Sequence, residues 1–244
     1  MFNQLKASLG FGAAKVDTVI NSQSYYQGES ISGTVYVKGG EVAQEIEAIT
    51  LKLCTEAKVE TDNGIRYEVV VLAQINANTP FTIGINEEKQ FNFTLPLPGE
   101  TPITALHTKR NQSQVWVETA LDINRGLDAK DRDLLVIKPL AIIEHILSQF
   151  TQAGYQLAKA DVEKGYLNGG YFKSTSGCYQ ELEFKNSSFF SSKEIELSFI
   201  LQDEEIHCLV EIDRTGSRGD SYRSFSFNRF ATEAEVTTLL ASIL

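Results

Sequence analysis

Cysteine, basic residues and long apolar runs are all scarce in this sequence. The three cysteines, Cys54, Cys178 and Cys208, are odd in number and widely spaced, which argues against a disulfide framework. No stretch approaches the roughly 18 apolar residues of a membrane span, and the start of the chain lacks the charged region and apolar run of a secretory signal. We therefore expect a cytoplasmic protein without a membrane span.

Acidic residues outnumber basic ones throughout the chain. Lysine and arginine number 22 against 32 aspartates and glutamates among 244 residues, which gives a formal net charge of −10. Nucleic-acid binding requires a basic face, and the sequence has no cluster of lysines and arginines to build one. Nucleic acid is therefore not an expected partner. The hydrophobic content of 42% is typical of a globular protein with one large core or two modest ones.

The common catalytic signatures are absent from the sequence. It contains no GxGxxG, GxxxxGK[ST], HExxH or GxSxG motif. The histidines, His107, His145 and His207, are dispersed; His207 has a cysteine, Cys208, beside it, but neighbours in a strand face opposite sides and cannot share an ion. We expect Cys208 in the core and His145 in solvent on a helix flank. No base, nucleophile and orienting group can be combined, so we do not expect an enzyme.

Four aspartates lie close together in the sequence, Asp122, Asp128, Asp131 and Asp133. Their number suggests a Ca²⁺ site or a catalytic carboxylate site, but their spacing does not match an EF-hand loop and no glycine stands in its middle. We expect them to cap turns between two strands, although the sequence leaves cation binding open. No catalytic, cofactor-binding or metal-ligating residue is assigned, and no cofactor is expected.

Two further features invite a functional reading. Residues 218–220 spell Arg-Gly-Asp, the tripeptide that integrins read, but we expect a cytoplasmic protein and interpret residues 213–220 as a hairpin loop. A set of aromatic residues could instead form a stacking platform for a carbohydrate or another small ligand: Tyr25, Tyr26, Tyr36, Tyr171 and Phe172. Such residues more often form cross-strand pairs, so ligand binding stands as the alternative function.

Residues 15–138 read as strands separated by turns. In the segment 26–37, Ile31, Val35 and Val37 share one face, Gly28 permits a positive φ, and Gly33 allows another backbone to approach closely. Asn63-Gly64 predicts a tight hairpin turn between strands 45–59 and 67–75. Strands are also predicted at 90–95, 115–123 and, fully buried, at 134–137. The polar segment 99–113 is an unusually long loop and hence a candidate functional segment.

The remaining sequence predicts helices at 1–12, 139–153 and 232–244 and a second group of strands. The linker helix begins at Pro139, and Thr232 with Glu235 has the spacing of a capping box. Strands are predicted at 179–184, 194–201, 205–213 and 221–227. The helix at 1–12 is too short to persist alone, so we expect it to dock on its own domain or across a homodimer. Its lone Lys6 makes peripheral membrane contact unexpected.

Several of these segments carry a resemblance to a known family. In the N-terminal half they are Gly12-Ala13-Ala14-Lys15-Val16-Asp17-Thr18, Gly28-Glu29, Ser32-Gly33-Thr34-Val35, Val37-Lys38-Gly39-Gly40, Thr101-Pro102-Ile103-Thr104 and residues 116–133. In the C-terminal half they are Pro139-Leu140, Gln180-Glu181-Leu182-Glu183-Phe184 and Val210-Glu211-Ile212-Asp213-Arg214. On these motifs the chain is identified as a member of the SpoOM family of sporulation-control proteins, which belongs to the arrestin-like clan.

The resemblance implies a mainly β fold with two β-sandwich domains, the first arrestin-like. The pattern of strands and helices predicts domain boundaries at 1–12 for the N-terminal helix, 13–138 for the arrestin-like sandwich and 139–244 for a second β-rich domain with its two helices. The resemblance further implies a bacterial regulatory protein of sporulation without a known catalytic site. Sandwiches of this kind present sheet edges and loops as docking surfaces, so we expect a non-enzymatic protein that acts through protein–protein contacts. Two departures stand out: Gln27 occupies a position where such turns often have proline, and a single arginine follows Asp213 where a more basic run is expected.

Overall fold

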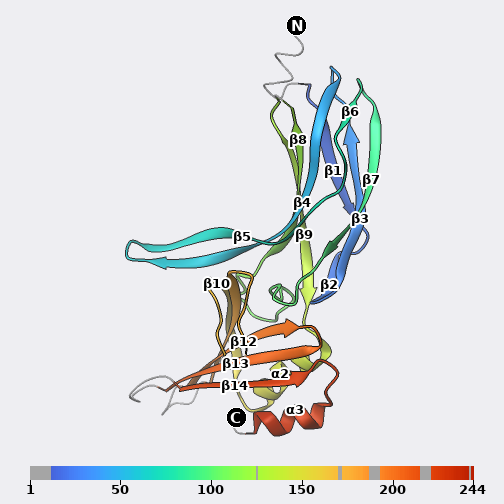
Figure 1. Ribbon diagram of the computed structural model, residues 1–244. Coiled ribbons are helices and arrows are strands. Elements are labelled where there is room, and N and C mark those ends of the chain that lie inside the picture. The colour runs from blue at the N-terminus through green and yellow to red at the C-terminus, as the bar shows by residue number, and fades with distance from the viewer. Residues whose placement is uncertain (1–11, 125, 170–171, 187–192, 215–220, 242) are drawn as a thin grey trace.

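A computed structural model confirms the mainly β class (Figure 1). The structure describes residues 12–124, 126–169, 172–186, 193–214, 221–241 and 243–244, so the predicted N-terminal helix, apart from Gly12, lies outside the described residues. The elements are β1 (Lys15–Ile20), β2 (Ser24–Tyr26), β3 (Ser30–Lys38), β4 (Gln44–Thr61), β5 (Gly64–Asn76), β6 (Phe81–Ile83), β7 (Glu88–Pro96), β8 (Val115–Ile123), β9 (Ala129–Lys138), α2 (Ala141–Gln152), β10 (Gln156–Lys164), β11 (Cys178–Lys185), β12 (Lys193–Gln202), β13 (Glu205–Arg214), β14 (Ser221–Asn228) and α3 (Glu233–Leu240).

The N-terminal half is a sandwich of two sheets. One sheet has the strand order β1-β3-β7, and the facing layer contains β4, β8, β9 and β2. Alternate residues of both layers form one apolar core, in which Ile31, Val35 and Val37 of β3 are buried as their spacing predicted. Gly28 has the expected positive φ of 82°. Leu134 and Val136 of β9 are exposed, so the prediction of a fully buried strand at 134–137 was wrong: the strand alternates and buries Leu135 and Ile137.

Trp116 is buried, but on the outer face of β8. Val115 and Val117 point into the sandwich core, so the intervening Trp116 lies on the opposite face of the sheet. There Arg132 covers the indole ring, with its guanidinium carbon 3.8 Å from the ring centroid. The side chain therefore packs against the outside of the sheet instead of filling the sandwich.

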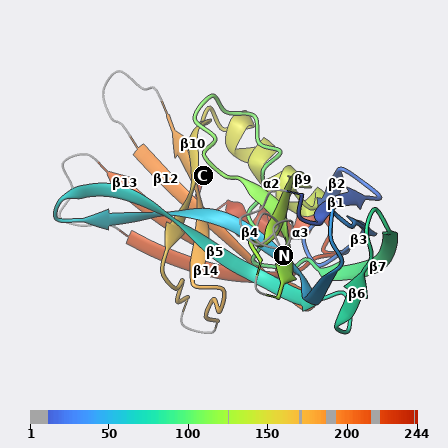
Figure 2. The ribbon, with the colours of Figure 1, turned by 90° about the horizontal axis from the view of Figure 1, so that it is seen from above.

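A long hairpin leaves the sandwich where β4 and β5 extend beyond it. Their pairing runs from Thr50↔Asn76 to Thr61↔Gly64, and the turn falls at the predicted Asn63-Gly64, with a φ of 117° at Gly64. Figures 1 and 2 both show the tip of this hairpin projecting away from the sandwich. We call residues 56–71 the arm.

The C-terminal half is a sheet in the order β14-β13-β12-β11-β10, with two helices on one face. Its core joins inward side chains of the sheet with Ile143, Ile146 and Phe150 of α2 and Val236 and Leu240 of α3. The capping box at Thr232 and Glu235 is present. The apolar stripes of the two helices cover this face of the sheet, so the layer opposite it is helical where a second sheet was expected.

The two halves are joined by pairing and by the segment 99–113. The first strand of the C-terminal sheet, β10, runs parallel to β4 through the pair Glu163↔Lys58. The buried amide of Gln180 accepts a hydrogen bond from Ile103 N at 2.9 Å and donates to Ile103 O at 2.7 Å, while Gln27 Nε2 donates to Thr101 O at 2.6 Å. Ile103 itself belongs to the C-terminal core. The segment 99–113 is therefore shared by both halves.

We predict that Gly33→Val destabilises the protein, although valine favours strands. A Cβ at position 33 would lie 2.4 Å from Val19 O of β1 and 2.9 Å from Phe93 Cε1 of β7, so β1 or β7 would have to move. Overpacking of this kind costs about 1 to 3 kcal/mol. Chemical denaturation measures the loss, and Ser30→Val, at the exposed start of the same strand, is the control. A Gly33→Val protein as stable as the control would contradict the close-approach argument.

Candidate functional site

The arm presents an apolar stripe to solvent. Ile65, Tyr67, Val69 and Val71 alternate along β5 and so share one face, with 60%, 48%, 58% and 45% of their surfaces exposed. Among the described strands β5 pairs only with β4, so its other edge has no partner strand there. Apolar residues on a free strand edge are uncommon in monomers, because such edges invite pairing with another chain.

The opposite face of the arm anchors it to the C-terminal half. Val70 and Ala57 form a small buried cluster with Val162 of β10 and Cys178 of β11. This packing fixes the base of the arm and turns the other face outward. The stripe is therefore held in position by the fold.

Next to the arm, the C-terminal sheet carries a row of carboxylates on the face away from its helices. Strand alternation points Asp161 and Glu163 of β10 and Glu181 and Glu183 of β11 to this side. We use the name acidic face for seven carboxylates on this side, Asp161, Glu163, Glu181, Glu183, Glu194, Glu196 and Glu211. The register sets like charges directly opposite one another: Asp161↔Glu181, Glu183↔Glu196 and Glu196↔Glu211. Like charges placed directly opposite one another destabilise a sheet, so stability alone does not account for the acidic face. Violations of this kind are expected at functional sites.

Burial and mutual repulsion shift the pKa values of the acidic face. Burial, together with the negative charges of Glu196 and Glu163, raises the pKa of Glu181 to about 8. Burial and the charge of Glu211 raise the pKa of Glu196 to about 7. Burial also raises the pKa of Glu163, although the hydrogen bond from Lys58 opposes this. Part of the acidic face is thus neutral near pH 7.

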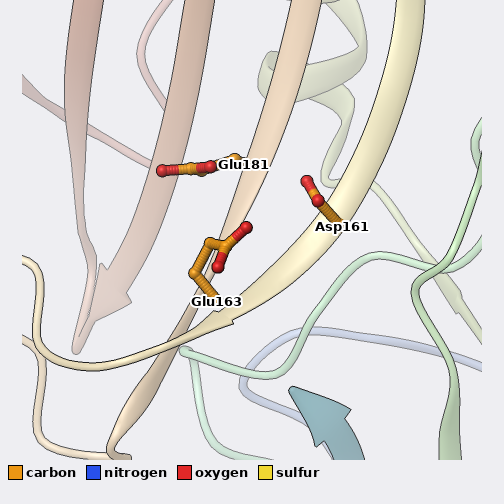
Figure 3. A group of neighbouring side chains, drawn as sticks. All are labelled: Asp161, Glu163 and Glu181. Atoms are coloured by element: carbon orange, nitrogen blue, oxygen red, sulfur yellow. The ribbon is translucent and has the colours of Figure 1, made fainter. Parts of the chain in front are cut away.

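Figure 3 shows Asp161, Glu163 and Glu181 directed toward a common space. Their carboxylate oxygens lie within 4.8 Å of one another, as do those of Glu183, Glu194 and Glu196, and oxygen ligands of this type suit hard cations such as Ca²⁺. Ammonium groups already reach both sets: Lys58 Nζ lies 3.0 Å from Glu163, Lys159 pairs with Asp161, and Lys185 Nζ lies 2.6 Å from Glu183. The acidic face is therefore suited to attract cationic groups, and lysines of the chain itself already neutralise some of its carboxylates.

The four aspartates identified from the sequence occupy other places. Asp128 Oδ1 accepts a hydrogen bond from Ile123 N at 3.3 Å, which is the predicted turn-capping role. Asp131 and Asp133 lie within β9 and not in a turn, and Asp131 Oδ2 accepts from Thr18 N of β1 at 2.7 Å. Burial, with the charges of Asp131 and Asp17, raises the pKa of Asp133 to about 6. Asp122 is exposed, so the four do not form one site.

The histidines and cysteines have structural surroundings. His145 is not solvated as expected: its Nε2 lies 3.0 Å from Thr237 Oγ1 and its Nδ1 3.4 Å from Glu233, so it links α2 to α3. His207 stacks on Phe172 at 4.5 Å and pairs with Ser226. Cys208 is buried in the core as predicted, and all three cysteines are free and buried. His107 is exposed in the segment 99–113.

The aromatic platform, which the sequence left as an alternative, does not form among the described residues. Tyr25 and Phe172 are buried, and the exposed Tyr26 and Tyr36 lie on the separate strands β2 and β3. Tyr171 and the Arg-Gly-Asp tripeptide at 218–220 lie outside the described residues. The alternative function in carbohydrate binding thus loses the feature that suggested it.

Sequence reasoning missed both the acidic face and the arm stripe. The alternating Ile65, Tyr67, Val69 and Val71 read as one half-buried strand, and nothing local shows which face is exposed. Glutamates of β11, β12 and β13 alternate with apolar residues, which predicted strands but not their register. A signal was present, since solvent-facing positions of three successive strands carry the same charge.

The chain is similar to proteins of known sequence and structure. A family model described as SpoOM protein matches residues 2–216. The sporulation-control protein spo0M of Bacillus subtilis (strain 168) is 36% identical over 223 residues, which cover 89% of this chain and 83% of that protein. The crystal structure of Spo0M from Bacillus subtilis superposes with a TM-score of 0.80 at 30% identity, covering 96% of this chain and 100% of that one. Within the described residues, no helix is both long and apolar enough to cross a membrane.

We predict that the stability of the protein falls as the pH rises from about 5 to 8. The pKa of Glu181 is about 8 in the folded protein against an ordinary 4.5, so the folded state holds this proton more tightly and its advantage is lost as the pH rises through 8. Glu181→Gln should raise the free energy of unfolding at pH 8 by at least about 1.4 kcal/mol, equivalent to one unit of pKa shift, and change it little at pH 5.

Thermal and urea denaturation at both pH values measure this difference. Glu47→Gln, which removes an exposed carboxylate on β4 of the sandwich, is the matched control and should leave the pH dependence unchanged. An equal response of the two variants at pH 8 would show that Glu181 is ionised and solvated.

Proposed function

Because the chain belongs to the SpoOM protein family, we propose that it is a non-enzymatic regulatory protein of the sporulation-control type that works in the cytoplasm through protein–protein contacts. The family match and the similarity to a sporulation-control protein support the regulatory role. The absence of an assembled set of base, nucleophile and orienting group among the described residues supports a binding function over catalysis.

The observation that carries the proposal is the exposed stripe on the arm. Its four apolar residues, Ile65, Tyr67, Val69 and Val71, sit on a projecting hairpin whose outer strand has no partner among the described strands. A partner protein can add a strand to this edge, with backbone hydrogen bonds for affinity and the stripe for specificity. The neighbouring acidic face supplies a field that favours a partner with basic residues beside its apolar segment and disfavours nucleic acid and anionic membranes.

We predict that a charged side chain introduced into the stripe abolishes partner binding without unfolding the protein. Val69→Lys replaces an exposed side chain, so the free energy of unfolding should change by no more than about 0.5 kcal/mol. A photoreactive phenylalanine analogue at Tyr67, 48% exposed, should form discrete protein adducts in the native cytoplasm, and these should disappear when Val69→Lys is added. Val19→Lys, at a valine of β1 that is 49% exposed against 58% for Val69, is the matched control and should keep the adducts.

The same variants test the regulatory role. In a Bacillus subtilis strain that lacks its sporulation-control protein spo0M, the unmodified chain and Val19→Lys should restore the spore titre, and Val69→Lys should not. Adducts that survive Val69→Lys would place the contact elsewhere on the molecule. An unmodified chain that forms no adducts and leaves the spore titre unchanged would refute the proposal.

A further inference from the structure

A cavity of about 910 Å³ lies where the two halves meet. Its walls come from residues 105–110 of the long connection, the junction between β9 and α2, the exposed side of α2 and the start of β10. Figure 2 shows the connection running beside α2. The volume falls within the range of about 300 to 1,000 Å³ that small-molecule sites occupy.

The inner wall of the cavity is apolar. Leu106, Leu147 and Leu157 line it, and each is a partly buried residue packed against the C-terminal core. Phe184, which is almost completely buried, also lines this wall. An apolar group that entered the cavity would therefore rest on the core itself and lose its contact with water.

The rim of the cavity is basic, in contrast to the rest of the chain. Lys109, Arg110 and Lys138 line it together with His107, against a single carboxylate, Glu144. Most other lysines of the described part of the chain are paired with carboxylates, whereas none of the ion pairs there involves Lys109, Arg110 or Lys138. In a protein with a net charge of −10, three unpaired cations at one opening form a local anion-attracting site.

The rim is held in place by hydrogen bonds. Thr108 Oγ1 donates to Ala158 O at 3.1 Å, and Ala160 N donates to Arg110 O at 3.1 Å, so the connection is fastened to β10 on both sides of Lys109. Asn111 Nδ2 donates to Thr104 O at 2.8 Å and closes the loop on itself. The basic groups thus extend from an ordered backbone, and a ligand would not have to order it.

We propose that this cavity binds an amphiphilic anion as a single molecule. The apolar body of the ligand lies on Leu106, Leu147 and Phe184, and its carboxylate or phosphate head pairs with Lys109, Arg110 and Lys138. A neutral apolar ligand leaves the rim cations unused, and a cationic one meets them with like charge. Because residues of both halves line the cavity, the bound molecule contacts the N-terminal β9 junction and the C-terminal helix α2 at once.

Isothermal titration calorimetry with the full chain tests the proposal. The probes are dodecanoate and dodecyl phosphate, both below their micelle-forming concentrations, with dodecyltrimethylammonium and inorganic phosphate as controls for charge and for the apolar chain. At least one anionic amphiphile should bind at one site and at least tenfold more tightly than either control. The preferred head distinguishes a carboxylate from a phosphate ligand.

Two variants locate the site. The double variant Lys109→Glu, Arg110→Glu should weaken binding at least tenfold, whereas Lys15→Glu, Lys52→Glu, which reverses two cations far from the cavity, should not. Thr151→Trp places a large side chain on an exposed position of α2 that lines the cavity and should block binding while the protein stays folded. Unchanged binding in both cavity variants would overturn the proposal, as would tighter binding of the cationic probe. Co-sedimentation with anionic vesicles but no binding of the monomeric amphiphiles would also overturn it.

Discussion

The structure depends on satisfying the backbone of the connection between β7 and β8. Residues 99–113 form no strand, and part of this irregular segment is buried between two β-rich halves, where unpaired N–H and C=O groups are costly. Side chains supply the missing partners. Gln27 of the N-terminal half donates a hydrogen bond to Thr101 O, and Gln180 of the C-terminal half hydrogen-bonds both the backbone N–H and the C=O of Ile103. The carboxylate of Glu100 accepts hydrogen bonds from the backbone N–H groups of Thr175 and Ser176. Separating the halves would strip these bonds, so the connection acts as a shared layer. It also explains why glutamine suits position 27: proline has no amide side chain to reach Thr101 O.

Strand β4, which both halves share, connects the apolar stripe of the arm with the acidic face. Its first part belongs to the sandwich, and its last part carries the arm and pairs with β10 at Lys58↔Glu163. Lys58 therefore joins the base of the apolar stripe to the edge of the acidic face, 3.0 Å from Glu163 and 2.6 Å from Glu60. An apolar edge and a negatively charged field consequently lie side by side. The stability lost by opposing carboxylates in the acidic face is tolerated because the helices cover the other face with a continuous core.

Local patterns predicted most of the elements, and long-range pairing determined the rest. Period-two alternation located β3, β8 and β11 to β14, and Asn63-Gly64 located the arm, because these signals act over a few residues. The strand β10 was missed because its outward positions carry the charged Lys159, Asp161 and Glu163, and its inward residues are mostly small. The alternation of large apolar and polar residues that predicts a strand is therefore weak there. His145 was misplaced because its partners Thr237 and Glu233 come from a helix about ninety residues later. The acidic face was invisible for the same reason: its residues are separated in sequence and meet only through the register of four strands.

The pairing of β2 with β9 has a consequence for the order in which the chain folds. Ser24 pairs with Val136 in parallel, and Thr18 N bonds to Asp131, 113 residues further along. During synthesis these contacts must therefore wait until β9 has left the ribosome, on the order of ten seconds at bacterial or eukaryotic elongation rates. Throughout this interval the arm hairpin can already form, since its strands are adjacent in sequence and hairpins close in microseconds. The nascent chain can thus present the apolar stripe before the sandwich that carries it is complete.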